Sequence, residues 1–425
     1  MNSSNWAGNY QYRAQHVHMP RSLEEVQDLV RAAQRIKAVG SRHSFNDIAD
    51  SPGDQVSLEA LPVQLDIDRE RSTVTVSGGI RYGDFIESLH RAGYAIHNLA
   101  SLPHISVAGA IATATHGSGV ANGNLASAVA GLELVTGTGE VLRVERGRPD
   151  FDGMVVALGA LGIVTRVTLD IQPRFEVRQD VYDTLSWASV AENFNAIMGA
   201  AYSVSLFTSW GDEGVTQAWL KSRTDADAPA SAEFFGGTYA REARHPLPGI
   251  SPVSTTEQVG VPGPWWNRLA HFKLDFTPSH GDEVQTEYLL PRGNALAAID
   301  ALRALGPRIA PHLFVAELRS VAADDLWLST AYHQHSVGFH FTWKKHTEAL
   351  ASLLPDIDAA LAPLRARPHW GKVFITDPGR LEALYPQLPA FRELAERLDP
   401  EHKFRNGYLD RSVFAQAAQP AEMGD

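Results

Sequence analysis

The chain has 425 residues, of which 44% are hydrophobic and 20% charged, and these values are typical of a soluble globular protein with two or three domains. Its net charge of −12 would repel nucleic acid and anionic membranes, so neither is expected as a partner. The sequence contains no cysteine, which excludes disulfides, thiolate nucleophiles and cysteine-ligated metal sites.

Neither a targeting peptide nor a membrane span is expected. The N-terminal stretch "MNSSNWAGNYQYRAQ" contains no apolar run, and nowhere in the chain do apolar residues continue long enough to form a membrane-spanning helix. The lack of cysteine also fits a reducing compartment. We therefore expect a cytoplasmic protein.

Helix and strand patterns alternate over the first 170 residues. Ser22 and Glu25 form a capping box before a predicted helix over 23–35, and "YGDFIESLHRAG" predicts a second helix that ends at Gly93. "STVTVS" predicts a strand and "LELVTGTGEVLRV" a hairpin, while "FDGMVVALGALG" predicts a helix followed by the strand "IVTRVTLDI". This order indicates an α+β fold, and the motifs of a Rossmann domain or a P-loop are missing.

Two segments of small residues stand out in this first part, and the first of them follows a short predicted strand. "GSRHS" lies at 40–44, and "SVAGAIATATHGSG" at 106–119 contains a possible helix. Small residues allow the backbone to approach a large ligand, and the N-terminus of a helix favours an anion. The alternative is a tightly packed buried helix. Taken together, the two segments suit the two sides of a dinucleotide clamp.

The amino-acid composition of the sequence changes after about residue 172. Residues 221–283 are rich in Pro, Gly and Ala but also contain Trp265 and Trp266, so they are too apolar for a disordered linker. We predict a long packed loop region, which in a compact domain is usually functional. Further strands follow, with helices near 345–363 and 381–397.

The stretch "GFHFTWK" predicts a strand with two different faces. Phe339, Phe341 and Trp343 share one face and are expected in a core, while His340 and Thr342 share the other. The pattern His333, His335 and His340 could suggest a metal site, but no carboxylate stands near them at a ligand spacing, so we predict no metal.

The stretch "LFVAELRSV" places Glu317 and Arg319 on one strand face, behind Leu313 and Val315. A charged pair at the end of an apolar strand face indicates a polar pocket above a packed floor. The alternative is a surface ion pair, which would contribute only about 0–1 kcal/mol.

Six motifs, in this order, resemble the vanillyl-alcohol-oxidase family of flavoproteins, and within it the alditol oxidases of the sugar-lactone-oxidase branch. They span nearly the whole chain: "GSRHSFN", "ASLPHISVAGAIATATHGSG", "LGALGIVTRVTL", "HFTW", "HWGKVF" and "LYPQLPAFRELAERLDPEHKFRNGYL". The resemblance implies a two-domain α+β flavoprotein, with an FAD-binding domain at 1–172 to which 400–425 returns. A substrate domain at 173–399 would lie over the isoalloxazine ring.

By the same resemblance, FAD is attached covalently through His43, with His116 as the rival attachment point. A neutral imidazole is a suitable nucleophile for this bond; the alternative is a loop histidine with one hydrogen bond. Arg42 stands where alditol oxidases can carry glycine, so its φ must stay negative or its side chain must point outward or toward a phosphate. The other implied cofactor contacts are Ala38, Val39, Gly40, Ser41, Ser44, Ser101, Ser106, Gly109, Thr113, Ala114, Thr115, Val164 and His369.

The resemblance also implies the substrate, a linear polyol whose terminal hydroxyl is oxidised to the aldose with release of hydrogen peroxide. His340 would be the general base and Glu317 would bind hydroxyls, while Arg319 and Lys372 would stabilise the developing alkoxide. Ala100 would leave a path for oxygen. The implied substrate contacts are Ser101, Gln285, Glu317, Arg319, His340, Thr342 and Lys372.

Three alternative functions remain open at this point. The nearest is an aldonolactone oxidase or dehydrogenase of the same branch. The others are a flavin-binding protein without turnover and a carbohydrate-binding protein without flavin. A monomer is expected from the resemblance.

Overall fold

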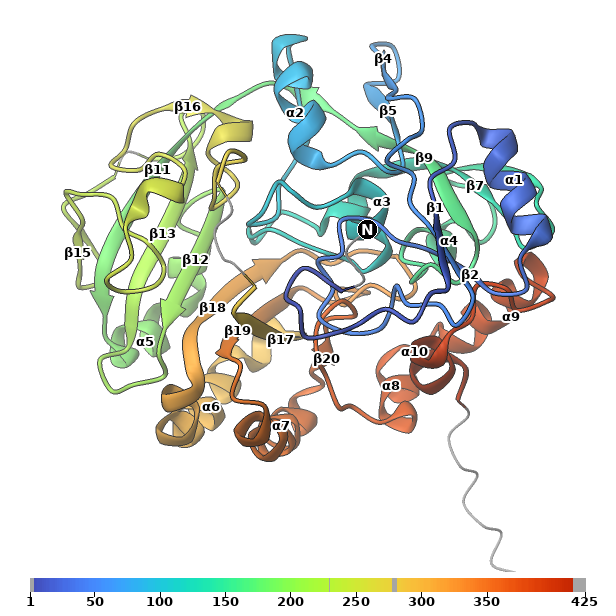
Figure 1. Cartoon of the computed structure of the whole chain (residues 1–425). Helices are drawn as coiled ribbons and strands as arrows, with labels where there is room; N and C mark the ends of the chain where they lie inside the picture. Colours follow the sequence, from blue (N-terminus) through green and yellow to red (C-terminus); the bar gives the residue numbers. More distant parts are fainter. Residues whose placement is uncertain (1–3, 229, 277–280, 416–425) are drawn as a thin grey trace, which may run out of the picture.

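The computed structural model describes residues 4–228, 230–276 and 281–415. Its first part contains a three-stranded parallel sheet, ordered β1-β3-β2, and a five-stranded antiparallel sheet, ordered β4-β5-β9-β7-β8 (Figure 1). The strands are β1 (His16–His18), β2 (Ile36–Ala38), β3 (Asp54–Val56), β4 (Leu65–Asp68), β5 (Thr73–Ser77), β7 (Val129–Val135), β8 (Val141–Glu145) and β9 (Ile163–Asp170), with the short pair β6 (Tyr94–Ala95) and β10 (Gln172–Pro173) beside them.

Four helices accompany these sheets, namely α1 (Leu23–Ala32), α2 (Tyr82–Arg91), α3 (Val107–Ala112) and α4 (Phe151–Val155). The start of α1 follows the prediction, because Ser22 Oγ accepts the N–H of Glu25 at 3.2 Å. The predicted helix over 151–162 is wrong beyond Val155. Leu158 and Gly159 adopt left-handed φ values of 54° and 64°, and their carbonyls accept hydrogen bonds from the buried Lys37 ammonium instead of from a helix.

The second part is built on a ten-stranded sheet. Its main path runs β14-β15-β11-β13-β12-β18-β19-β17-β20, and β16 pairs with β11. The strands are β11 (Glu176–Leu185), β12 (Ser203–Thr208), β13 (Val215–Arg223), β14 (Glu233–Phe234), β15 (Gly237–Tyr239), β16 (Gly263–Pro264), β17 (Glu283–Pro291), β18 (Leu313–Val321), β19 (Ser336–Lys344) and β20 (Arg367–Pro368).

Helices α5 (Trp187–Met198), α6 (Ala295–Ile309) and α7 (Thr347–Leu361) cover one face of this sheet (Figure 1). Phe339, Phe341 and Trp343 are completely buried in the core between the sheet and these helices, as the alternation in "GFHFTWK" predicts. The opposite face of β17, β18 and β19 is therefore left to carry the polar residues, and it looks toward the first domain.

Described residues of the region 221–283 contact both domains. Trp265, Leu269 and Ala270 pack in the core of the first domain, and the N–H groups of His271 and Phe272 donate to the Ser101 carbonyl at 3.0 and 3.2 Å. This agrees with the prediction of a packed loop region.

The C-terminal helices pack against the first domain (Figure 1). The helix predicted near 381–397 is interrupted, giving α8 (Pro378–Leu384) and α9 (Leu388–Leu398), because Pro386 has no N–H to donate between them. Leu381 and Phe391 already lie in the first domain's core, ahead of the return that we expect at 400, and α10 (Gly407–Leu409) follows. The domain limits stay predictions, and 416–425 lies outside the described residues.

No helix within the described ranges is long and apolar enough to cross a bilayer.

Candidate active site

A cavity of about 510 Å³ lies between the two domains. One end is lined by the loop that follows β2, and the other by the polar face of β17, β18 and β19. With one exception, every residue predicted to contact cofactor or substrate lines this cavity, including His43, Ser101, Val164 and His369. The exception is Ala114, which is completely buried in the hydrophobic core beside it, with a φ of 53°.

The two small-residue segments meet at the first end of the cavity. A Cβ at Gly40 would lie 2.2 Å from Ser106 Oγ and 3.2 Å from Ser106 Cβ, so a side chain at this position would force Ser106 to move. The N–H of Ser106 donates to Ser41 Oγ at 3.1 Å. Within the described ranges, no protein acceptor is found for the backbone N–H groups of residues 40–44. A loop with free N–H groups on a narrow slot fits the diphosphate of FAD.

His43 stacks on Trp6, with ring centroids 5.1 Å apart and an interplanar angle of 20°. Its Nδ1 lies 3.0 Å from the Ser41 carbonyl, which can only accept, so Nδ1 carries the hydrogen and Nε2 keeps its lone pair. Burial lowers the pKa of His43 to about 4, and the ring is therefore neutral at neutral pH. These are the properties that a nucleophilic imidazole needs.

Arg42 is expected to have either a negative φ or a side chain that points outward or toward a phosphate. Its φ is 60°, in the left-handed region, so the first alternative does not hold and the second stays a prediction. In this conformation its carbonyl accepts the N–H of Trp6 at 2.8 Å, which holds the N-terminal segment beside His43. Its Nε is buried and has no partner in the part of the chain that is described.

At the other end of the cavity, register places polar residues in a row across the sheet. Glu287 on β17 is paired with His340 on β19, which is paired in turn with Glu317 on β18. Gln285 is likewise paired with Thr342. The predicted shared face of His340 and Thr342 is therefore confirmed.

The predicted apolar floor behind Glu317 and Arg319 is only partly right. The pairing of β18 with β19 shifts between Leu313 and Val315. Because of this irregularity Leu313 packs in the core under the sheet, while Val315 packs near Phe207 on the other face.

Glu287 is the residue that the sequence analysis missed at the centre of the site. Its carboxylate is 1% exposed, and Oε1 lies 3.0 Å from Arg319 Nη2 and 3.1 Å from His116 Nε2. Oε2 lies 2.5 Å from Lys372 Nζ. Burial alone would raise the pKa of Glu287, but Lys372, His116 and Arg319 lower it well below 4.5. The spacing of Glu287 from Gln285, two residues before it on one strand face, was a signal that could have identified it.

His340 contacts three polar groups. Its Nδ1 lies 2.6 Å from Lys372 Nζ and 3.6 Å from Glu287 Oε2, and its Nε2 lies 3.1 Å from Thr342 Oγ1. Burial, followed by the charge of Lys372, lowers the pKa of His340 to about 4, so the imidazole is neutral near neutral pH. Burial also lowers the pKa of Lys372, against the opposing effect of Glu287.

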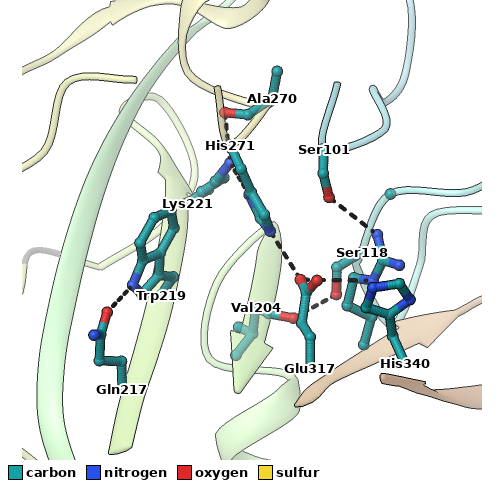
Figure 2. Close-up of polar contacts among 12 residues, drawn as sticks. Ser101, Ser118, Val204, Gln217, Trp219, Lys221, Ala270, His271, Glu317 and His340 are labelled. Atoms are coloured by element: carbon teal, nitrogen blue, oxygen red, sulfur yellow. Dashed lines mark hydrogen bonds and ion pairs between the residues drawn. The ribbon is translucent and has the colours of Figure 1, made fainter. Parts of the chain in front are cut away.

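His271 is a second residue missed by sequence reasoning, and it comes from the 221–283 region. Its Nε2 lies 2.8 Å from Glu317 Oε1 at the cavity wall, as Figure 2 shows. No periodicity marks this loop, so nothing in the sequence indicated the contact.

Among the described residues, one group of side chains has ligand atoms close enough to hold a metal ion. His116, Glu287 and His369 bring such atoms within 4.8 Å of one another, whereas the predicted pattern of His333 and His335 does not enter this group. The oxygens of Glu287 already face Arg319 and Lys372, so the carboxylate is the counter-ion of these cations.

Taken as chemistry, this end of the cavity offers a neutral imidazole, two cations and two carboxylates around one small space. Such a set can accept a proton from a hydroxyl, stabilise the oxygen that becomes negative, and bind further hydroxyl groups. The loop end fits FAD.

Comparison with known proteins identifies two matching family models in different parts of the chain. A model of the FAD binding domain matches residues 14–145, and a model of D-arabinono-1,4-lactone oxidase matches residues 281–412. The chain is 47% identical over 409 residues to an alditol oxidase of Streptomyces sp., covering 96% of this chain and 97% of that protein.

More distant relatives include an L-gulono-1,4-lactone dehydrogenase of Mycobacterium tuberculosis, 29% identical over 96% of this chain and 98% of that protein. The L-gulonolactone oxidase of Bos taurus is 27% identical, with the same coverage. Among solved structures, a cholesterol oxidase from B. sterolicum has a TM-score of 0.75 over 96% of each chain, at 14% identity, and so shares the fold.

The role of Glu287 as a counter-ion gives a stability prediction. Glu287→Gln should lower the free energy of unfolding at neutral pH by about 3–5 kcal/mol, because the buried Lys372 loses its carboxylate partner and Arg319 keeps only Glu317. The lowered pKa means that this contribution is present above the unfolded pKa, near 4.5, and is lost as the pH falls below it. Denaturant unfolding at a series of pH values should therefore show the difference from wild type shrinking in acid.

The exposed Glu192 on α5 provides the control for this experiment. Glu192→Gln should change the free energy of unfolding by no more than about 0.5 kcal/mol. If Glu287→Gln were as stable as Glu192→Gln at neutral pH, the proposed counter-ion role would be wrong.

Proposed function

The chain belongs to the vanillyl-alcohol-oxidase family of flavoproteins, in the branch of alditol and sugar-lactone oxidases, and from this membership we propose that it is an FAD-dependent alditol oxidase. It would oxidise the terminal primary hydroxyl of an alditol such as xylitol or sorbitol to the aldose and produce hydrogen peroxide. The observation that carries the proposal is the row of Glu287, His340 and Glu317 with Arg319 and Lys372, in the cavity that fits FAD.

The loops at the first end of the cavity would hold FAD. The N–H groups of residues 40–44 would bind its diphosphate, and His43 would form the covalent bond through a ring nitrogen. When bound, FAD supplies the acceptor for the hydride of the alditol C1, and oxygen then restores it. The remaining contacts would come from residues 38–39, Ser101, Ser106, Gly109, Thr113, Thr115, His116, Val164 and His369, all of which line the cavity.

His340 is proposed as the general base. In the site as described, the Lys372 ammonium donates to Nδ1 at 2.6 Å, and Nε2 faces Thr342 Oγ1 at 3.1 Å. For Nε2 to accept a proton, the ring hydrogen must move to Nδ1, where Glu287 Oε2, 3.6 Å away, can accept it while Lys372 stays charged. A substrate hydroxyl would replace Thr342 Oγ1 at Nε2 and donate its proton there.

The other side chains would bind the substrate. Arg319 lies within 3.3 Å of Ser101 Oγ, and with Lys372 it would stabilise the oxygen as it loses its proton. Glu317, Gln285 and Thr342 offer acceptors and donors to the remaining hydroxyls. Ala100, which is small and lines the cavity, would leave room for oxygen. The cytoplasmic location and the monomeric state stay predictions.

Of the alternatives, action on an aldonolactone is less favoured, since the lactone enzymes are more distant relatives than the alditol oxidase. A flavin-binding protein without turnover would have no use for two buried cations beside a neutral imidazole, because burying charges is costly.

The substrate assignment is tested by measuring peroxide formation in air with xylitol, sorbitol and L-gulono-1,4-lactone. We expect kcat/KM for at least one alditol to exceed that for the lactone by about tenfold or more, since every oxygen of an alditol can donate to the carboxylates. A preference for the lactone would overturn the assignment.

The covalent bond is tested by acid precipitation, which does not depend on activity. The yellow colour of wild type should remain in the pellet, while the colour of His43→Ala should pass into the supernatant. His116→Ala examines the rival attachment point and should keep its colour in the pellet. Release of the wild-type colour, or of the His116→Ala colour alone, would contradict a bond to His43.

The base is tested with His340→Ala, which should bind FAD normally but reduce it about 100-fold or more slowly with xylitol. Added imidazole should restore part of the rate. The control is His335→Ala, which replaces an exposed histidine and should behave as wild type. A near-normal rate of flavin reduction in His340→Ala would remove this residue from the role of base.

A further inference from the structure

A chain of buried polar side chains leads from the large sheet to the cavity. Lys221 on β13 is 1% exposed, and its Nζ lies 2.5 Å from the Leu269 carbonyl, 2.9 Å from the Ala270 carbonyl and 2.9 Å from His271 Nδ1. His271 Nε2 lies 2.8 Å from Glu317 Oε1. Figure 2 shows the three side chains in sequence, with Glu317 at the end beside His340.

The direction of these hydrogen bonds is determined by the groups at the two ends. An ammonium has three hydrogens, and Lys221 meets three acceptors: two carbonyls and Nδ1 of His271. Nε2 then carries the hydrogen of the neutral ring and donates it to Glu317. If the shared proton sits on Nδ1 instead, Nε2 is still protonated. In both arrangements His271 donates and the carboxylate accepts.

The imidazole is held in place from several sides. Trp219 contacts it edge to face at 5.2 Å between centroids, and Phe207 lies at 5.8 Å. The backbone of His271 is fixed as well, because its N–H donates to the Ser101 carbonyl and its own carbonyl accepts from Thr256 at 2.9 Å. Lys221 therefore holds the loop, and the loop presents His271 to Glu317 in one orientation.

Burial lowers the pKa of both Lys221 and His271, and the Glu317 carboxylate opposes the shift in each case. On Glu317 itself, burial would raise the pKa, but Arg319 and His271 lower it. Glu317 is consequently an ionised carboxylate. Its contacts with His271 and Arg319 are made through Oε1, no partner for Oε2 is found among the described residues, and the residue lines the cavity. This oxygen is available to a ligand and can only accept.

We propose that Lys221 and His271 are positioning residues that keep Glu317 as an acceptor-only carboxylate in the cavity, and that this device selects acyclic polyols over lactones. The inference rests on the proposed function. Every oxygen of an alditol carries a hydrogen and can donate to Glu317. A lactone has a ring oxygen and a carbonyl oxygen without hydrogens, and either of them facing the carboxylate would be left unpaired and repelled.

The experiment compares Lys221→Met with Lys403→Met. Lys403 is a matched control, since it is also buried and donates to two backbone carbonyls, those of Val30 and Arg31, but does not line the cavity. In Lys221→Met the KM for xylitol should rise about 10- to 100-fold, with a smaller change in kcat. The ratio of kcat/KM for xylitol to that for L-gulono-1,4-lactone should fall by about tenfold or more. Lys403→Met should leave both unchanged.

Two variants of His271 separate positioning from packing. His271→Leu should lower the ratio of kcat/KM for xylitol to that for the lactone as Lys221→Met does. His271→Gln keeps an amide donor for Glu317, so part of this selectivity should be retained. If Lys221→Met and His271→Leu showed the same selectivity ratio as Lys403→Met, the proposal would be overturned.

A measurement on the wild-type holoenzyme keeps the proposal testable if these variants do not fold. Nitrogen-15 NMR of labelled histidines should show His271 protonated at Nε2, and a signal for the opposite tautomer would contradict the proposal. If wild type oxidised no alditol, the proposed function would be wrong. The NMR measurement does not depend on turnover, so the two failures can be told apart.

Discussion

The buried carboxylate of Glu287 is the interaction on which the arrangement of the site depends. It lies against Arg319 on β18, Lys372 in the loop after β20 and His116 of the first domain, so it links three segments that are far apart in the sequence. Neither cation could remain charged at this depth without a partner. Their position beside His340, and hence the ability to stabilise a developing negative oxygen, follows from one side chain that sits behind them.

The charges around the cavity explain what kind of ligand suits it. Arg319 and Lys372 are balanced by Glu287 and Glu317, and His340 is neutral because its pKa is lowered. A site with paired charges gives little net attraction to an anion but offers many donors and acceptors. That is the requirement of a neutral molecule with several hydroxyl groups, and it is consistent with the 47% identity to an alditol oxidase.

The sequence predicted local patterns better than long-range ones. Alternation in "GFHFTWK" correctly separated the buried aromatic residues from His340 and Thr342, because strand periodicity is a local property. The small residues of the two segments predicted that they form two sides of one clamp, and Gly40 and Ser106 do lie close together. The resemblance to the family supplied most of the remaining cavity residues.

The features that the sequence did not predict depend on contacts between residues far apart in the chain. The predicted helix after residue 151 ends at Val155, and the residues that follow it turn at Leu158 and Gly159, whose carbonyls accept from the distant Lys37. Arg42 takes a left-handed φ while its carbonyl accepts from Trp6. Glu287 was recognisable from its spacing to Gln285 but was not singled out. His271 could not have been found, since its contact with Glu317 depends on how a loop without periodicity packs between the domains.

The central claim is that a yellow flavin cofactor and a site for polyol hydroxyls share one cavity. The most direct measurement is the visible absorption spectrum of the purified protein, recorded without air before and after the addition of xylitol. The account predicts an oxidised flavin band that disappears on addition and returns with oxygen. A colourless protein, or a flavin band that no alditol removes, would contradict it.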